Sequence, residues 1–174
     1  TPGNYNRIYT ADVNADGGLS LGRNMDGDGA ETLVGDAPSK PLGGGEEVNW
    51  SADGKAVYFT LRQADANEAK STNLDIYKSE YALGDPINVT PTNRATDTMP
   101  TPSPDGKYLA WAAMARAGYE ADRQVLMLRD LKSGKVTALT DKWDRSVGSI
   151  AWAADGKSLL VVAADTLEHP LFRV

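Results

Sequence analysis

Three stretches of the chain repeat one pattern: Val48-Asn-Trp-Ser-Ala-Asp-Gly-Lys-Ala-Val-Tyr-Phe-Thr60, Pro100-Thr-Pro-Ser-Pro-Asp-Gly-Lys-Tyr-Leu-Ala-Trp-Ala112 and Ile150-Ala-Trp-Ala-Ala-Asp-Gly-Lys-Ser-Leu-Leu-Val-Val162. Their Asp-Gly-Lys triplets begin at positions 53, 105 and 155, so the repeat is 52 and then 50 residues long. Self-similarity at about 40–50 residues is typical of the four-stranded blades of a propeller. The repeat therefore predicts an all-β fold.

Each repeat predicts a hairpin centred on its Asp-Gly pair. In the second repeat Pro104 has the φ that a type I turn needs at its second position, and Gly106 accepts the positive φ that follows. Alanine replaces the proline in the other two repeats, which keep the glycine at 54 and 156. Runs of β-forming residues follow the turns, so we expect central strands buried on both faces at 57–59, 109–111 and 159–162.

A second hairpin completes each blade. Apolar runs predict further strands at 76–77, 126–128 and 171–174, with return strands that end in 88–90 and 138–140. The same register predicts a strand at 8–10 and a weaker partner at 32–34. Trp50, Trp111 and Trp152 recur at strand positions, where we expect them in the core between blades.

The predicted fold class is all-β: a partial β-propeller of about three four-stranded blades, with incomplete blades at both ends. Its parts are a divergent partial blade at 1–44, a blade at 45–95, a blade at 96–145 and an incomplete blade at 146–174. A partial propeller leaves apolar blade faces and strand edges open. We therefore expect the segment to self-associate, as a two-fold dimer that buries these faces.

Composition restricts the class of partner. The net charge is −6 and lysine and arginine occur scattered, which argues against nucleic acid. No apolar stretch approaches the length of a membrane span, and no signal peptide is present in the segment. The chain has no cysteine, which excludes disulfides and thiolate metal sites. We expect no cofactor.

One stretch matches the pattern of a catalytic serine. Gly18-Leu-Ser20-Leu-Gly22 fits Gly-x-Ser-x-Gly, in which a strand enters and a helix leaves so that the serine oxygen is exposed. Turn residues follow this stretch instead of a helix, and the one histidine, His169, stands before Pro170 at a strand-like end. We therefore predict no catalytic residue in these 174 residues.

An acidic, glycine-rich region partly matches a calcium loop. Asp12-Val-Asn14-Ala-Asp16-Gly17 has oxygen ligands at loop positions 1, 3 and 5 and glycine at 6, and Asn24-Met-Asp26-Gly-Asp28-Gly29 repeats this. Position 12, which needs a bidentate carboxylate, is Arg23 in one copy and Gly35 in the other. The sequence predicts no metal site, and the weak candidates are Asp12, Asn14, Asp16, Asp26 and Asp28.

Three motifs resemble a known family: Ser103-Pro-Asp-Gly-Lys-Tyr-Leu-Ala-Trp111, Ala117-Gly-Tyr-Glu-Ala-Asp-Arg123 and Glu168-His-Pro-Leu-Phe172. The first resembles the TolB-type PD40 propeller repeat. Together they resemble the N-terminal propeller of the prolyl oligopeptidase (S9) family, in its bacterial dipeptidyl-peptidase and acylaminoacyl-peptidase group. The resemblance covers roughly residues 46 to 174.

The resemblance implies a division of labour. In that family an α/β-hydrolase domain, absent from these residues, supplies serine, aspartate and histidine, while the propeller covers the active site and filters peptide substrates. It also implies a periplasmic or secreted location. The alternative is a TolB-like scaffold that binds a protein partner, with no hydrolase. Both readings fit the repeat.

The resemblance further implies that propeller loops reach the active site, where a carboxylate can pair with the free amino terminus of a substrate. Glu120 is the candidate for this role, and Arg116 and Arg123 are its neighbours in a substrate-gating loop. The alternative is structural: Glu120, Asp122, Arg116 and Arg123 form an ion-pair network that fixes the loop.

Overall fold

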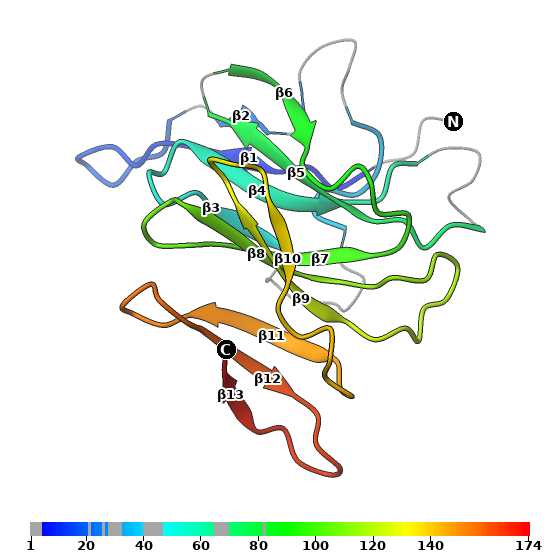
Figure 1. Ribbon diagram of the computed structural model, residues 1–174. Coiled ribbons are helices and arrows are strands. Elements are labelled where there is room, and N and C mark those ends of the chain that lie inside the picture. The colour runs from blue at the N-terminus through cyan, green and yellow to red at the C-terminus, as the bar shows by residue number, and fades with distance from the viewer. Residues whose placement is uncertain are drawn as a thin grey trace.

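The structure is a computed structural model that describes residues 5–20, 22–25, 27, 33–39, 47–64, 70–81 and 83–174. Within these residues the chain forms antiparallel sheets and no α-helix, so the predicted all-β class is confirmed. Figure 1 shows the four-stranded and three-stranded sheets lying one below another in chain order, from β3–β6 to β7–β10 and then β11–β13. The described part of the chain contains no helix that is long and apolar enough to cross a membrane.

We number the sheets I to IV along the chain. Sheet I pairs β1 (Tyr9–Thr10) with β2 (Arg23–Asn24). Sheet II has the order β3 (Val48–Trp50), β4 (Ala56–Leu61), β5 (Asp75–Glu80) and β6 (Leu83–Asn88). Sheet III has the order β7 (Asp97–Pro102), β8 (Tyr108–Ala113), β9 (Val125–Asp130) and β10 (Val136–Ala138). Sheet IV comprises β11 (Val147–Trp152), β12 (Leu159–Ala163) and β13 (Leu171–Arg173).

The three Asp-Gly turns form as predicted. The glycine in each has a positive φ, 68° at Gly54, 70° at Gly106 and 65° at Gly156, which a residue with a Cβ rarely adopts. In sheet III the carboxylate of Asp105 accepts hydrogen bonds from the Ser103 hydroxyl at 2.7 Å and the Lys107 amide at 3.1 Å. The chain therefore reverses tightly here, and each turn joins the first two strands of its sheet.

Strand alternation decides how the sheets pack. Side chains on a strand point alternately to opposite faces. In β8, Leu109, Trp111 and Ala113 pack toward sheet II with Tyr58, whereas Ala110 packs toward sheet IV. Each layer between two sheets therefore contains the even-numbered side chains of one central strand and the odd-numbered side chains of the next central strand. The layer between sheets I and II contains Met25, Ala37, Val57, Phe59, Leu61 and Tyr77.

The prediction that all three repeated tryptophans lie in the core is wrong for Trp50. Its side chain is 50% exposed, while Trp111 is 3% exposed and Trp152 is partly buried. Trp50 and Trp152 each face the preceding sheet. The ring of Trp152 stacks on the ring of Tyr108 in sheet III, with centroids 6.3 Å apart, and its indole N–H donates to the backbone carbonyl of Thr101. In the described residues sheet I consists of two short strands, so Trp50 has no comparable cover.

The predicted partner of the first strand is also different. β1 pairs with β2, in the register Tyr9 opposite Asn24, and not with the stretch 32–34. Leu33 and Val34 lie outside every strand, and position 32 is outside the described residues. At Gly35 φ is +142°, and a Cβ there would stand 2.2 Å from the Arg62 carbonyl oxygen. The chain turns at this glycine, which ends the extended run.

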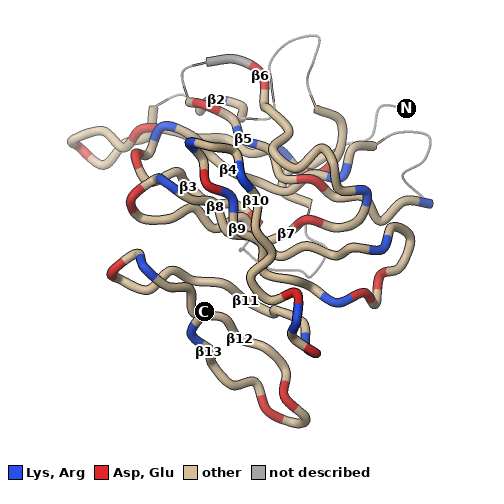
Figure 2. Tube along the Cα trace, in the orientation of Figure 1, with Lys and Arg blue, Asp and Glu red and all other residues tan. Residues whose placement is uncertain are grey.

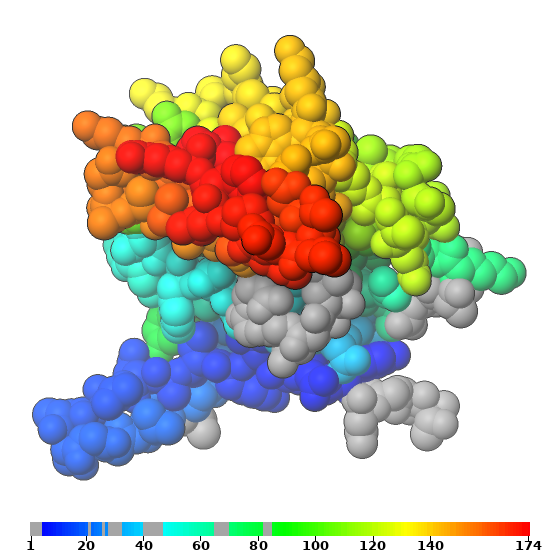
Figure 3. Space-filling model, turned by 90° about the horizontal axis from the view of Figure 1, so that it is seen from below, coloured from blue at the N-terminus to red at the C-terminus, as the bar shows by residue number. Residues whose placement is uncertain are grey.

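Central strands differ in how completely they are covered. All six residues of β4 are buried, as predicted, because sheets lie on both of its faces. In β12 the residues facing sheet III are buried, but Leu160 and Val162 are half-buried. Among the described residues no further sheet covers this second face. Figure 3 shows sheet IV, orange to red, at the front of the molecule when it is viewed from below.

Candidate functional site

Connections alternate between the two ends of the sheets. The tight turns after β3, β5, β7 and β9 lie at one end, which we call the turn end. The longer loops after β4, β8 and β12, together with the connections between sheets, lie at the other, which we call the loop end. The predicted gating residues belong to the loop after β8, residues 114–124, and therefore stand at the loop end.

Asp122 organises this loop. Its Oδ2 accepts hydrogen bonds from the backbone amides of Ala115 at 2.9 Å and Arg116 at 2.8 Å, and its Oδ1 pairs with Nε of Arg116 at 2.9 Å. Desolvation alone would raise the pKa of this carboxyl, but these donors outweigh it and lower the pKa to about 2. Asp122 therefore stays ionised and closes the base of the loop.

Two further contacts hold the tip of the loop. The guanidinium of Arg116 lies 4.0 Å from the centre of the Tyr119 ring, a cation–π contact. The amide of Gly118, where φ is +77°, donates to Oγ1 of Thr72 at 2.8 Å. Thr72 belongs to the loop after β4, so the loops after β4 and β8 support one another.

Arg123 is held in a different direction. Its two terminal nitrogens donate to the carbonyl oxygens of Thr140 and Asp141, both at 2.8 Å, in the connection from β10 to β11. Of the four residues considered for an ion-pair network, only Arg116 and Asp122 form an ion pair within the described part of the chain. The structure thus separates Arg123 from Arg116, and both from Glu120.

Glu120 is the one predicted gating residue that is free to bind. It is exposed, and its carboxylate has no hydrogen bond or ion pair within the described residues. It lines a hollow of about 470 Å³ together with Arg62, Thr72 and Tyr119. A carboxylate in this state can accept a charged donor from a molecule that reaches the loop end.

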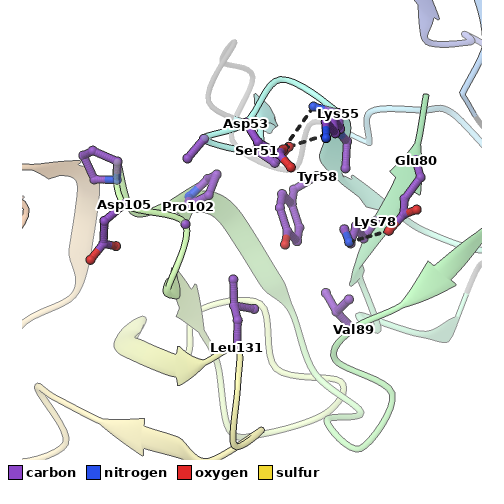
Figure 4. A pocket seen from close by; sticks show the side chains of 14 residues that line it. Ser51, Asp53, Lys55, Tyr58, Lys78, Glu80, Val89, Pro102, Asp105 and Leu131 are labelled. Atoms are coloured by element: carbon purple, nitrogen blue, oxygen red, sulfur yellow. Dashed lines mark hydrogen bonds and ion pairs between the residues drawn. The ribbon is translucent and has the colours of Figure 1, made fainter. Parts of the chain in front are cut away.

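Sequence reasoning missed a hollow at the turn end. Its volume is about 720 Å³, and it lies between sheets II and III (Figure 4). The ring of Tyr58 points into it, beside the ion pair between Lys78 and Glu80, whose atoms are 2.8 Å apart. The signal in the sequence was the alternation of Tyr58, Lys78 and Glu80 on their strands, which places all three on the face toward sheet III.

A third cavity, of about 550 Å³, lies between sheet III and the connection from β6 to β7, and sequence reasoning missed it as well. It is lined by Asp97, the first residue of β7, which is 1% exposed. Burial raises the pKa of this carboxyl to about 7, against the hydrogen bond from Trp111. The available signal was an acidic residue at a position where the next repeat has Val147.

Two of the described metal candidates are hydrogen-bonded within the protein. The Asp12 carboxylate accepts the Tyr81 hydroxyl at 2.8 Å, and the Asp16 carboxylate accepts the Gly18 amide at 2.8 Å. Among the described residues no three acidic, histidine or cysteine side chains come together to hold an ion. Asp26 and Asp28 lie outside the described residues. Asn14 lies between Asp12 and Asp16 in the loop after β1, which Figure 3 shows in blue, extending from the rest of the molecule.

Ser20, in the stretch that matches Gly-x-Ser-x-Gly, and His169 lie in different parts of the fold. The Ser20 hydroxyl accepts the Asp12 amide at 2.8 Å in the loop between β1 and β2. His169 is exposed in the loop between β12 and β13.

Figure 2 shows basic and acidic residues interspersed over the described loops, with no continuous stretch of either sign.

Comparison with known proteins shows relatives over most of the chain. Dipeptidyl-peptidase 5 of Porphyromonas gingivalis is 35% identical over 161 residues, which cover 91% of this chain and 23% of that protein. A probable dipeptidyl-peptidase 5 of Arthroderma benhamiae is 33% identical over 147 residues, 79% of this chain and 20% of that protein. No family model matches.

Solved structures support the fold. TolB from Acinetobacter baumannii superposes with a TM-score of 0.61 at 17% identity, over 88% of this chain and 32% of that chain. The tricorn protease superposes with a TM-score of 0.56 at 15% identity, over 87% of this chain and 13% of that chain. The predicted partial propeller is therefore confirmed. The chain spans about a fifth of the length of the dipeptidyl-peptidase 5 proteins, to which it is homologous.

Proposed function

We propose that the chain is the propeller portion of a dipeptidyl peptidase, and that its loop end admits and orients peptides for a hydrolase domain. The single observation that carries the proposal is Glu120: an exposed carboxylate without a partner in the described residues, at the tip of a loop held by Asp122 and Thr72. Because the loop backbone is held before a ligand arrives, binding of a charged amine does not have to order the loop. The role is recognition and not bond cleavage.

The relatives favour a peptidase over a scaffold. The proteins that are 33–35% identical carry the name dipeptidyl-peptidase 5, whereas the likeness to TolB, at 17% identity, speaks for the fold alone. A dipeptidyl peptidase must distinguish the amino terminus of its substrate, and the ammonium group there is the feature that a carboxylate selects. The proposal includes a periplasmic or secreted location for the protein.

The experiment compares short fluorogenic peptides with free and with acetylated amino termini, using the full-length protein. The proposal predicts release of dipeptides from the free peptides and slow cleavage of the acetylated ones. A gating propeller also predicts that short peptides are cleaved in preference to unfolded proteins of the same sequence content. Equal cleavage of free and acetylated peptides, or no cleavage of either, would contradict the proposed function.

A further inference from the structure

The cavity between sheet III and the connection from β6 to β7 has the dimensions of a small-molecule site. Its volume is about 550 Å³, inside the range of about 300–1,000 Å³ that is usual for ligand pockets. Apolar side chains form more than half of its wall: Trp111, Ala113, Met114, Ala115, Val125, Met127, Val136 and Ala138. The cavity is distinct from the hollow beside Glu120, with which it shares no lining residue.

One carboxylate is buried in this apolar wall. Asp97 is 1% exposed, and its Oδ1 accepts the indole N–H of Trp111 at 2.7 Å. Its Oδ2 is also buried and has no hydrogen-bond partner in the described part of the chain. A buried polar atom without a partner costs free energy that a bound donor would recover.

Neither cation of the cavity wall forms an ion pair with Asp97 in the described part of the chain. The two cations on the cavity wall, Arg123 and Arg129, donate to backbone carbonyls of the connections that flank sheet III. The remaining charged residue of the wall, Asp141, is exposed and negative. Burial raises the pKa of Asp97, and the negative charge of Asp75 raises it further, while Trp111 and the polar side chains of Asn93 and Thr90 lower it.

We propose that this cavity binds a small apolar amine, whose ammonium group donates to Oδ2 of Asp97 while its hydrocarbon body lies against Trp111 and Met127. The unpaired Oδ2 needs a hydrogen-bond donor, and an aromatic face with a thioether beside it suits both an ammonium group and its apolar substituent. The site would act independently of the peptide-recognition role proposed for Glu120.

Isothermal titration calorimetry tests this with three probes of similar shape: 3-phenylpropan-1-amine, 3-phenylpropan-1-ol and 3-phenylpropionate. The full-length protein carries Glu120→Gln, so that an amine bound at the loop tip does not contribute. We expect the amine to bind at pH 8, the alcohol to bind about tenfold more weakly or worse, and the anion not to bind. Equal affinity for the amine and the alcohol, or no binding of the amine, would overturn the proposal.

Variants locate the bound amine. Asp97→Asn keeps the shape of the side chain and should weaken amine binding about 10- to 100-fold. Asp141→Asn removes an exposed negative charge from the same cavity and should change the affinity less than about twofold. If Asp97→Asn does not fold, Ala138→Phe tests the site, because a phenyl ring at this half-buried lining position should block binding. Amine binding that survives the folded Asp97 variant, or the Ala138 variant, contradicts the assignment.

Discussion

The indole Nε1 of Trp111 donates a 2.7 Å hydrogen bond to Oδ1 of Asp97, and this contact joins β8 to the first residue of β7 inside the protein. Both side chains are buried, at 3% and 1% exposure. Hydrogen bonds to a charged group are stronger than neutral ones, especially away from water. The pair therefore fixes the loop end of sheet III and also sets the chemistry of the cavity beside it.

Replacing Trp111 by phenylalanine should be costly, because it leaves the Asp97 carboxylate without its donor. We expect Trp111→Phe to lower the free energy of unfolding by about 2–4 kcal/mol, from the lost charged hydrogen bond and the smaller ring. Trp152→Phe is the comparison: its indole donates to the neutral Thr101 carbonyl at 3.0 Å and is only partly buried. Urea denaturation of both variants gives the answer, and equal losses would contradict the role assigned to Asp97.

Stability should depend on pH through Asp97. Burial raises its pKa from 3.8 to about 7, so between these values the folded chain holds a proton that the unfolded chain has lost. The unfolding free energy therefore falls as pH rises from about 4 to about 7, by an amount on the order of 4 kcal/mol, and then levels off. Asp97→Asn should remove this slope. Parallel stability curves for the wild type and the variant between pH 4 and 8 would refute the prediction.

The loop after β8 should lose order when Asp122 is neutral. The pKa of Asp122 is held at about 2 in the folded chain, so the ionised carboxylate stabilises the fold fully above the pKa of the unfolded chain. This stabilisation disappears as pH falls through about 2. At pH 7, Asp122→Asn should speed hydrogen exchange at the amides of Ala115 and Arg116, which Oδ2 accepts, without a large change in melting temperature. Unchanged exchange at these two amides would show that the carboxylate does not hold the loop.

Turn glycines should resist substitution where their φ is positive. Gly156 has a φ of 65°, and a Cβ there would meet nothing within 4 Å, so Gly156→Ala isolates the conformational cost of about 1 kcal/mol. Gly148 has no positive φ, and a Cβ there would make an ordinary contact of 3.5 Å. Gly148→Ala should therefore cost less. Thermal melting compares the two variants, and a larger loss at position 148 would contradict this reading of the turn.

The repeat predicts the hairpins because their cause is local. A glycine that follows an aspartate at a turn specifies the backbone conformation wherever the chain carries it, as at Gly106. The face of the sheet on which Trp152 lies is also determined locally, by the alternation of side chains along its strand. Whether a side chain is buried depends on the neighbouring sheet, so Trp50 and Trp152 differ although their sequence contexts match.

The candidate site also has some features that the sequence can predict and others that depend on packing. The family resemblance and the insertion between two strands make Glu120 and its loop candidates, but the partners of Arg123 are carbonyl groups in another connection. A backbone carbonyl has no signature in a sequence. Asp97 was missed for a related reason: an isolated acidic residue at a strand start predicts an exposed position, and only the packing of sheet II against sheet III buries it.

The most direct test of the proposed function measures kcat/KM of the full-length protein for a peptide with a free amino terminus and for its acetylated form. Glu120→Gln should reduce the ratio of the two values by about tenfold or more, because the substitution removes a charged partner of the amine. Glu168→Gln, at an exposed acidic residue in the loop after β12, is the matched control and should leave the ratio unchanged. A ratio that Glu120→Gln does not alter would contradict the role of Glu120 in substrate recognition.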